Sequence, residues 1–398
     1  MQNQTKKLIL IDGNAIIHRS YHALPPFTTK KGELVNAVYG FASTLLSIIS
    51  KFEPEYIIAT FDLAGPTFRH LEYEKYKATR IKGDDALYAQ IPRVKEITRA
   101  FGIPIYEMSG FEADDIIGTL ASQAKKIESS QEKLETIIVT GDMDTLQLVN
   151  DKTKVYTMRR GLTDAALYGE AEIFERFSLA PKQLIDYKGL RGDPSDNIPG
   201  VKGIGEKTAI ELLKKYGSLE NIYAHLEEIK GAVKDKLEKD KMIAIQSKGL
   251  ATISKTVPIE LDLEKAVTRE FDKQKLLALF EELNFHSLKK RISSTDSKPR
   301  IRRGGFESTN ENTGVKDFKF EIADKENHKE LLENLKNQKE LAIKLKTAGT
   351  NAHNSALLGI AIACKAGRAV FFDLEDKNIF AEIKNILENK NIEKIGFD

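Results

Sequence analysis

Three short aliphatic runs, each followed by an aspartate, constrain the fold of this chain more than any other feature. Residues 8–11 lead into Asp12, residues 56–61 into Asp62, and residues 136–140, after one glycine, into Asp142. Each run is as long and as rich in Ile, Val or Phe as a strand buried on both faces. Helical patterns at 36–50, 86–101 and 113–126 separate the runs. This alternation predicts an α/β fold with a mostly parallel sheet.

The carboxyl ends of parallel strands meet at one edge of a sheet, where such folds bind ligands. Acidic residues at 110–115 and 192–197 are expected at the same edge. Like charges repel unless they take up protons or cations, and oxygen ligands without His or Cys favour Mg²⁺ or Mn²⁺ over zinc. We therefore predict two divalent cations, an arrangement suited to phosphodiester hydrolysis. The candidate ligands are Asp12, Asp62, Glu112, Asp114, Asp115, Asp142, Asp144, Asp193 and Asp196.

An aspartate after a strand can also be no more than a helix N-cap. For a single residue such as Asp114 that alternative is adequate. Acidic residues recur in five separate segments, however, and this recurrence favours a shared site.

Residues 67–80 combine basic and aromatic side chains at helical spacing. Basic groups neutralise phosphates, and aromatic rings stack on unpaired bases. The segment therefore predicts a helix that binds single-stranded DNA, within an arch at about 66–100. A solvated charged helix with its tyrosines packed on the core is the alternative. The residues on the predicted face are Arg69, Tyr73, Tyr76, Lys77 and Arg80.

The glycine-rich segment at 198–213 lies between two helical patterns and predicts a helix–hairpin–helix. Glycines allow backbone N–H groups to approach a phosphate, and a helix N-terminus favours an anion. Such a module holds duplex DNA without reading its sequence. An ordinary turn between helices is the alternative. The expected contacts are Gly200, Lys202, Gly203, Gly205, Lys207 and Thr208.

The rest of the chain suggests three further regions. A helical pattern at 181–288 predicts a subdomain beside the 1–180 core, the two together forming a 1–288 domain. Residues 289–316 are basic and aperiodic, as in a flexible linker. Strands at 341–345 and 356–372, with a turn at Ala366 and Gly367, and a helix at 378–389 predict a partial α/β domain at 317–398.

The composition excludes several classes of protein. The single cysteine, Cys364, rules out an intrachain disulfide and suits a reducing cytosol. No apolar run is long enough for a signal peptide or a membrane span. These features indicate a soluble intracellular protein, and the net charge of +2 says little about its partners.

Six motifs resemble those of the 5′-nuclease (flap endonuclease, PIN-like) domain at the N-terminus of bacterial DNA polymerases I. They are Ile-Asp-Gly-Asn at 11–14, Phe-Arg-His at 68–70, Tyr-Lys-Ala-Thr-Arg at 76–80, Phe-Glu-Ala-Asp-Asp at 111–115, Thr-Gly-Asp-Met-Asp at 140–144 and the glycine-rich segment at 192–209. Leu71 departs from the family, where many members have Glu.

The resemblance implies that the nine carboxylates above bind two Mg²⁺ or Mn²⁺ ions, with K⁺ as a candidate ion at the hairpin. It assigns catalytic roles to Lys77, Arg80 and Asp115, with Lys77 facing the scissile phosphate and the arch admitting a 5′ single strand. The implied substrates are 5′ flaps, nicked or branched duplexes and RNA primer–DNA junctions, met during replication and repair. We expect a monomer in a bacterial cytoplasm, near the nucleoid.

Residues 317–398 resemble the start of the ribonuclease H-like 3′–5′ exonuclease domain of the same polymerases. An active domain carries Asp-x-Glu in its first strand, whereas residues 343–346 read Ile-Lys-Leu-Lys. Because two lysines cannot bind the catalytic metals, we expect this partial domain to be inactive.

Two other functions are compatible with parts of the sequence. Residues 141–145 resemble the Asp-x-Asp-x-Thr nucleophile of haloacid-dehalogenase-type phosphatases, in which Asp142 would be phosphorylated. That reading leaves the arch, the hairpin, Asp193 and Asp196 unexplained. A non-catalytic module that binds branched DNA is the second alternative, and the complete set of carboxylates argues against it.

Overall fold

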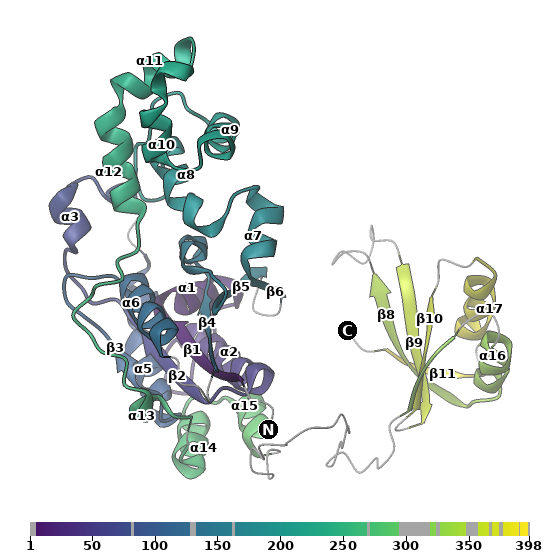
Figure 1. Ribbon diagram of the computed structural model, residues 1–398. Helices are drawn as coiled ribbons and strands as arrows, with labels where there is room; N and C mark the ends of the chain where they lie inside the picture. Colours follow the sequence, from purple (N-terminus) through teal and green to yellow (C-terminus); the bar gives the residue numbers. More distant parts are fainter. Residues whose placement is uncertain are drawn as a thin grey trace. The chain divides into compact units, whose positions relative to one another are not determined.

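The computed structural model describes residues 5–80, 83–127, 133–160, 164–268, 271–293, 319–323, 327–347, 357–365, 368–373, 377–389 and 391–396. The chain divides into two compact units, Met1–Ser293 and Ser294–Asp398. Figure 1 shows the elements of both units.

A six-stranded sheet in the order β3-β2-β1-β4-β5-β6 forms the centre of the first unit. All neighbouring strands are parallel except β5 and β6, which are antiparallel. The mostly parallel sheet predicted from the sequence is therefore confirmed. Its strands are β1 (Thr5–Asp12), β2 (Tyr56–Thr60), β3 (Ile105–Tyr106), β4 (Lys133–Thr140), β5 (Thr153–Arg160) and β6 (Asp164–Tyr168).

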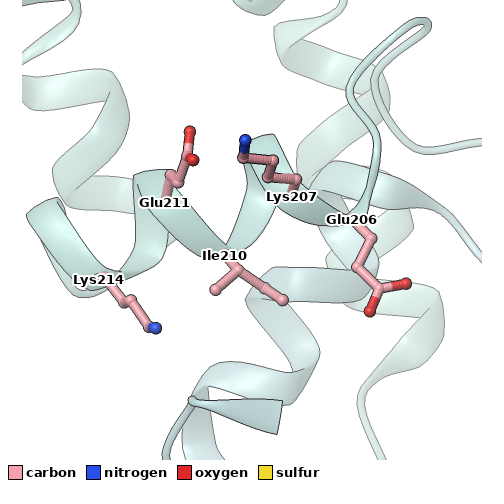
Figure 2. Close-up of a pocket in the computed structure, with 5 residues that line it drawn as sticks. All are labelled: Glu206, Lys207, Ile210, Glu211 and Lys214. Atoms are coloured by element: carbon pink, nitrogen blue, oxygen red, sulfur yellow. The ribbon is translucent and has the colours of Figure 1, made fainter.

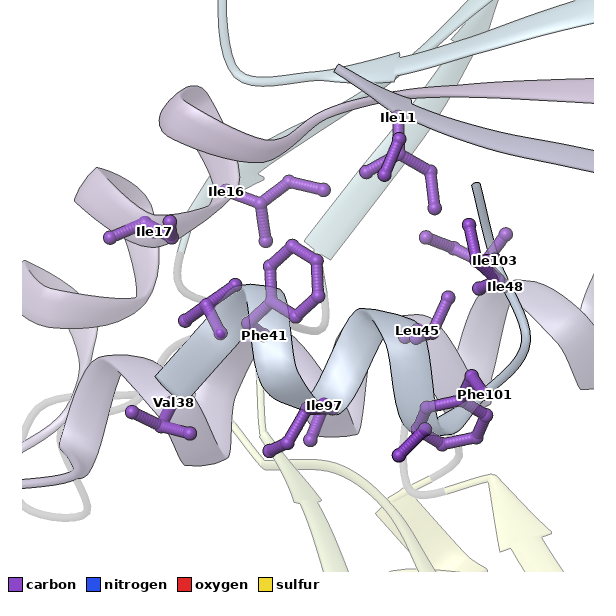
Figure 3. Close-up of a cluster of buried hydrophobic side chains, with 14 of the residues drawn as sticks. Ile11, Ile16, Ile17, Val38, Phe41, Leu45, Ile48, Ile97, Phe101 and Ile103 are labelled. Carbon is purple, nitrogen blue, oxygen red and sulfur yellow. The ribbon is translucent and has the colours of Figure 1, made fainter. Parts of the chain in front are cut away.

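Helices cover both faces of this sheet, so the central strand β1 is buried on both sides. Alternate β1 residues point to opposite faces: Ile9 and Ile11 join one apolar cluster, and Leu8 and Leu10 join the other. The first cluster packs against α1 (Gly13–Ala23), α2 (Asn36–Phe52) and α5 (Ile91–Ala100), as Figure 3 shows around Phe41. The second packs against α6 (Ala113–Lys126) and the 3-10 helix η1 (Met143–Leu148).

The predicted helix at 86–101 is two helices in the structure, α4 (Asp85–Tyr88) and α5. Pro92 lies in the first turn of α5, where its missing N–H costs nothing. Between the two helices, the buried side chain of Gln90 accepts the backbone N–H of Ala37 at 2.9 Å. The break therefore lets Gln90 cap the start of α2.

The helical region after the sheet contains the predicted helix, glycine-rich turn and helix: α8 ends at Arg191 and α9 begins at Glu206. Leu190, Val201, Ile204 and Leu213 share one buried cluster, which holds the turn between the two helices. The elements are α7 (Glu170–Phe177), η2 (Pro181–Gln183), α8 (Leu184–Arg191), α9 (Glu206–Tyr216), α10 (Leu219–Ala224), η3 (Leu226–Glu228), α11 (Ala232–Lys239), α12 (Lys241–Ala251) and α13 (Leu263–Ala266).

Two helices that the sequence assigned elsewhere belong to the core of the sheet. Phe280 of α14 (Lys273–Glu282), Phe285 just before α15 (His286–Ser293) and Leu288 of α15 join the same cluster as Phe41. The prediction that 289–293 begins an aperiodic linker was wrong, because Ile292 is buried and α15 continues to Ser293. The remaining linker residues, 294–316, lie outside the described residues.

The second unit has a five-stranded sheet in the order β11-β8-β9-β10-β7. Its antiparallel strands β8 and β9 and its helix α17 agree with the predicted elements, while the predicted turn at 366–367 lies outside the described residues. Lys344 on β8 is exposed. The elements are β7 (Lys319–Ile322), α16 (His328–Lys336), β8 (Glu340–Thr347), β9 (Leu357–Lys365), β10 (Arg368–Asp373), α17 (Lys377–Glu388) and β11 (Glu393–Gly396).

Among the helices in the described part of the chain, none combines the length and the apolar character needed to span a bilayer.

The packing of α14 can be tested with one phenylalanine from the core and one from the surface. Phe280 is 0% exposed, whereas Phe174 on α7 is 62% exposed. We expect Phe280→Ala to lower the free energy of unfolding by about 3–5 kcal/mol, the usual effect of emptying a buried aromatic site. Phe174→Ala should change it by less than about 1 kcal/mol. Urea unfolding of both variants checks this, and equal losses would contradict the packing of α14 on the core.

Candidate metal centre and nucleic-acid interface

The carboxyl ends of β1, β2 and β4 bring three predicted aspartates together. Asp12 ends β1 and caps α1, accepting from the Ala15 N–H at 2.9 Å and from the Thr140 hydroxyl at 2.8 Å. Asp62 accepts the N–H of Ala113 at 2.7 Å. Asp142 accepts the N–H of Asp144 at 2.9 Å as the cap of η1. Helix capping and membership of a shared acidic site therefore coexist here.

Burial and mutual repulsion disfavour the charged forms of these groups. Burial raises the pKa of Asp12 to about 7, and the charges of Asp62 and Asp142 add to the shift. Burial also raises the pKa of Asp62, with the Glu112 charge contributing. A divalent cation would relieve both effects, because it favours the ionised carboxylates.

Asp114 comes from the start of α6 and has a carboxylate oxygen within 4.8 Å of oxygens of Glu112 and Asp115. Its Oδ1 atom is buried and has no hydrogen-bond partner in the structure. Burial raises the pKa of Asp114 well above its usual value, and the nearby Asp115 charge raises it further. A buried carboxylate oxygen without a donor is costly unless a cation binds it. The chemistry of Asp12, Asp62 and Asp114 therefore fits a hard divalent cation.

Asp115, in contrast, accepts hydrogen bonds at both of its oxygens. Its Oδ1 accepts from Arg69 at 2.7 Å and from the Ser254 N–H at 2.7 Å. Its Oδ2 accepts from Arg69 at 2.8 Å and from the Glu112 N–H at 3.2 Å. Each oxygen thus receives two hydrogen bonds. Asp115 therefore positions the start of α6 in this structure. One of its oxygens also lies within 4.8 Å of oxygens of Glu112 and Asp114, so its role as a metal ligand stays a prediction.

The predicted DNA-binding helix at 67–80 is wrong. Only α3 (Phe68–Glu72) is helical, and the chain then turns, with Lys77 at a φ of +55°. Arg69 is 1% exposed and Tyr76 is 4% exposed, so neither presents a surface to DNA in this structure. Tertiary contacts outweigh the helical spacing here, because the buried Arg69 guanidinium forms ion pairs with Glu112 and Asp115 at the start of α6.

Three residues of this segment face the acidic site instead. The Tyr76 hydroxyl donates to Glu112 at 3.0 Å and to Asp196 at 3.3 Å. Lys77 pairs with Glu112, and Arg80 pairs with Asp196. Tyr73 is half-buried beside Tyr76. Lys77 and Arg80 are therefore the basic groups of this segment at the edge of the acidic site.

A second acidic group consists of Asp144, Asp193 and Asp196, whose oxygens lie within 4.8 Å of one another. Lys188 on α8 donates to Asp193 at 2.5 Å and also pairs with Asp144. Burial raises the pKa of Asp144 to about 6. Burial also acts to raise the pKa of Asp193, but Lys188 and Ser195 outweigh it and the pKa falls to about 2. Sequence reasoning missed Lys188, which carries no motif signal of its own.

The glycine-rich turn has the backbone geometry that a helix–hairpin–helix requires. Gly200 has a φ of +64°, and a Cβ there would overlap the backbone of Gly192. Gly205 caps α9 with open space around it. Lys202 and Lys207 are exposed, Thr208 is half-buried, and Lys236 of α11 donates to the Gly203 carbonyl at 3.0 Å. The turn thus presents backbone and lysines to solvent.

A shallow hollow along α9 has mixed charge. Its lining residues, shown in Figure 2, are Glu206, Lys207, Ile210, Glu211 and Lys214. Figure 2 also shows Lys207 and Glu211 pointing to the same side of the helix. Because none of the nine candidate ligands lines it, the hollow is separate from the acidic site.

Comparison with known proteins decides the family. Residues 7–178 match the 5′-3′ exonuclease, N-terminal resolvase-like domain, and residues 179–274 match the 5′-3′ exonuclease, C-terminal SAM fold. The chain belongs to the 5′–3′ exonuclease family. The family predicted from the motifs is thereby confirmed, and so is the presence of a 5′–3′ exonuclease domain.

Curated relatives extend the similarity into the second unit. DNA polymerase I of Bacillus caldotenax is 37% identical over 364 residues, which cover 91% of this chain and 39% of the relative. DNA polymerase I of Bacillus subtilis is 37% identical over 397 residues, covering 99% of this chain and 42% of the relative. The chain thus spans about two fifths of the length of these relatives.

Solved structures of bacteriophage T5 share the fold of the first unit. The T5 D15 protein, co-crystallized with metal ions, has a TM-score of 0.51 at 17% identity over 73% of this chain and 99% of its own. T5 5′-exonuclease with bound zinc has a TM-score of 0.50 at 19% identity over the same shares. At these identities the likeness supports the fold alone.

The buried Arg69–Asp115 pair should matter far more to stability than the Arg80–Asp196 pair. The side chains of Arg69 and Asp115 are 2% and 0% exposed, while that of Arg80 is 51% exposed. We expect Arg69→Met to lower the free energy of unfolding by about 3–5 kcal/mol, because it leaves a buried carboxylate unpaired. Arg80→Met should cost about 1 kcal/mol or less, since solvent screens that pair. Urea unfolding measures both, and similar small losses would argue against the role given to Asp115.

Proposed function

We propose that this chain hydrolyses a phosphodiester bond near the 5′ end of branched DNA with the help of two divalent cations, Mg²⁺ or Mn²⁺. The observation that carries the proposal is the unpartnered buried oxygen of Asp114 at the start of α6, a helix whose first turn also donates a backbone N–H to Asp62. Support comes from the family and from the T5 relatives, one of which was crystallised with DNA and metal ions.

The two acidic groups would each hold one cation. Asp12, Asp62, Glu112 and Asp114 form the first group. We assign Asp142, whose charge acts on both Asp12 and Asp144, to the second group with Asp144, Asp193 and Asp196. Bound divalent cations lower the pKa of water and stabilise charge on phosphate oxygens. Asp115 supports the first group indirectly, because it accepts the Glu112 N–H and anchors Arg69.

Basic groups of the chain would position the substrate around these carboxylates. Lys77 and Arg80 already lie at the edge of the acidic site, where a phosphate could replace Glu112 and Asp196 as their partner. We assign Lys77 to the scissile phosphate. The backbone of the hairpin, with Lys202 and Lys207, would hold the duplex through its phosphates. K⁺ at the hairpin stays a prediction.

The biological task that we propose is the removal of RNA primers and displaced 5′ flaps during replication and repair, by a monomer in a bacterial cytoplasm. The chain would act as the N-terminal part of a DNA polymerase I. The second unit would contribute no 3′–5′ exonuclease activity, because lysines replace the acidic residues of its first catalytic motif.

Cleavage of a 5′-labelled single-flap duplex tests the nuclease directly. We expect a short 5′ product with Mg²⁺ and none with EDTA. Asp114→Asn should slow cleavage on the order of a hundredfold or more, because it weakens binding of the cation that stabilises negative charge on the phosphate oxygens. Asp272→Asn is the matched control, since Asp272 is an exposed cap of α14, and it should cleave normally.

Two other outcomes of that assay would be informative. Normal cleavage by Asp114→Asn would remove Asp114 from the proposed site. Tight flap binding without product, at any concentration of Mg²⁺ or Mn²⁺, would favour the non-catalytic DNA-binding module.

Substitution of two hairpin glycines should show that protein stability and DNA binding can be lowered separately. Gly200→Ala should lower both, because its side chain would overlap the Gly192 backbone. Gly205→Ala should keep its melting temperature, since the space around Gly205 is open. The affinity of Gly205→Ala for a nicked duplex, measured by fluorescence anisotropy in EDTA, should fall about tenfold. The added Cβ would keep a phosphate too far from the backbone N–H groups, so that one charge-assisted hydrogen bond is lost. Unchanged binding by Gly205→Ala would contradict phosphate contact at the start of α9.

A further inference from the structure

The two acidic groups differ in how far the chain itself neutralises them. In the first group, the direct donors to Asp12 and Asp62 are neutral: two backbone N–H groups and the Thr140 hydroxyl. Asp114 has one oxygen without any donor. Among the described residues, Glu112 is the member of this group that forms ion pairs, with Lys77 and Arg69. The charges of Lys77 and Arg80 also act on Asp62, and those of Arg69 and Lys77 act on Asp114. Within the described residues, Asp12, Asp62 and Asp114 thus form no ion pair with a lysine or arginine, and no ammonium bridges them as Lys188 bridges Asp144 and Asp193.

In the second group, the chain places its own cations between the carboxylates. Lys188 donates to Asp193 at 2.5 Å and pairs with Asp144, so one ammonium bridges both. Arg80 pairs with Asp196. The side chain of Lys188 is 19% exposed, and it lies on α8, a helix of the packed helical region. The three acidic residues that could hold a cation here thus already share two positive charges.

A divalent cation and the Lys188 ammonium compete for the same oxygens. Both are hard cations that carboxylate oxygens attract, and bringing them together would set like charges within a few ångströms of each other. The second group can therefore bind a divalent cation well only after Lys188 has moved away from Asp144 and Asp193. The first group carries no such requirement at Asp12, Asp62 or Asp114.

We propose that Lys188 is a built-in cation of the second acidic group and makes the two metal sites fill in order. The first group binds a divalent cation directly, and the second binds one more weakly because the ion must displace Lys188. This inference rests on the proposed function, in that it takes both groups as cation sites. It adds a residue that sets how strongly the second site binds.

Mn²⁺ binding to the full chain without DNA tests the order. Free Mn²⁺ can be followed by electron paramagnetic resonance, which needs no catalysis. We expect one tight site in the wild type and a second site at least tenfold weaker. Lys188→Met should strengthen the second site at least tenfold, while Lys188→Arg should behave as the wild type because it keeps the charge.

Lys248→Met is a closely matched control. Lys248 also bridges two carboxylates, those of Asp186 and Glu220, each at 2.6 Å, and its side chain is 21% exposed. Lys248→Met should leave both Mn²⁺ affinities unchanged, because Asp186 and Glu220 belong to neither acidic group.

The outcomes distinguish this inference from the proposed function. Absence of any tight Mn²⁺ site would overturn the proposed function itself. Two equal sites in the wild type, or an unchanged second site in Lys188→Met, would overturn only the ordering by Lys188.

A measurement on the wild type covers the case in which Lys188→Met fails to fold. Acetic anhydride acetylates a lysine amine faster when the amine is accessible and is not held in an ion pair. Mass spectrometry measures the extent of acetylation at each lysine. Saturating Mg²⁺ should raise the rate at Lys188 at least fivefold and leave Lys248 unchanged. An unchanged rate at Lys188 would overturn the proposal.

Discussion

The guanidinium of Arg69 is buried against Asp115, and this ion pair connects three parts of the first unit. Arg69 comes from α3 and Asp115 from α6, while the remaining donors of Arg69 reach the carbonyls of Leu250 and Thr252 at the end of α12. Two buried charges are tolerated only when their hydrogen bonds are complete, as they are here. The pair therefore couples the start of α6, which carries Glu112 and Asp114, to the helical region.

Electrostatic asymmetry follows from that arrangement. At the strand ends, Asp12 and Asp62 accept hydrogen bonds from neutral donors, and at the start of α6 Asp114 has a buried oxygen without a donor. Burial raises the pKa of all three carboxyl groups. The second group receives Lys188 and Arg80 from the chain itself. The molecule thus keeps one acidic group open to external cations and the other partly neutralised, although a motif search would treat both alike.

Sequence reasoning succeeded where local patterns decide the structure. The aliphatic runs became β1, β2 and β4, and the helix at 113–126 has the predicted bounds as α6. The glycine turn before α9 was recognisable because Gly200 needs a positive φ that few residues adopt. It failed where distant contacts decide. Residues 67–80 have helical spacing, yet the helix ends at Glu72. Arg69 pairs with Asp115, and the residues after the helix form turns in which Lys77 pairs with Glu112.

The sequence by itself determined the class of fold, the edge of the sheet at which acidic residues gather and the family to which the chain belongs. It did so because strand burial, helix periodicity and motif order are properties of neighbouring residues. Only the tertiary structure decided which carboxylates remain free for a cation. Asp115 and Asp114 are adjacent in the sequence, but one has all its oxygens saturated by residues far along the chain and the other has a buried oxygen with no donor. Hydrogen-bond saturation depends on partners that meet only when the chain is folded.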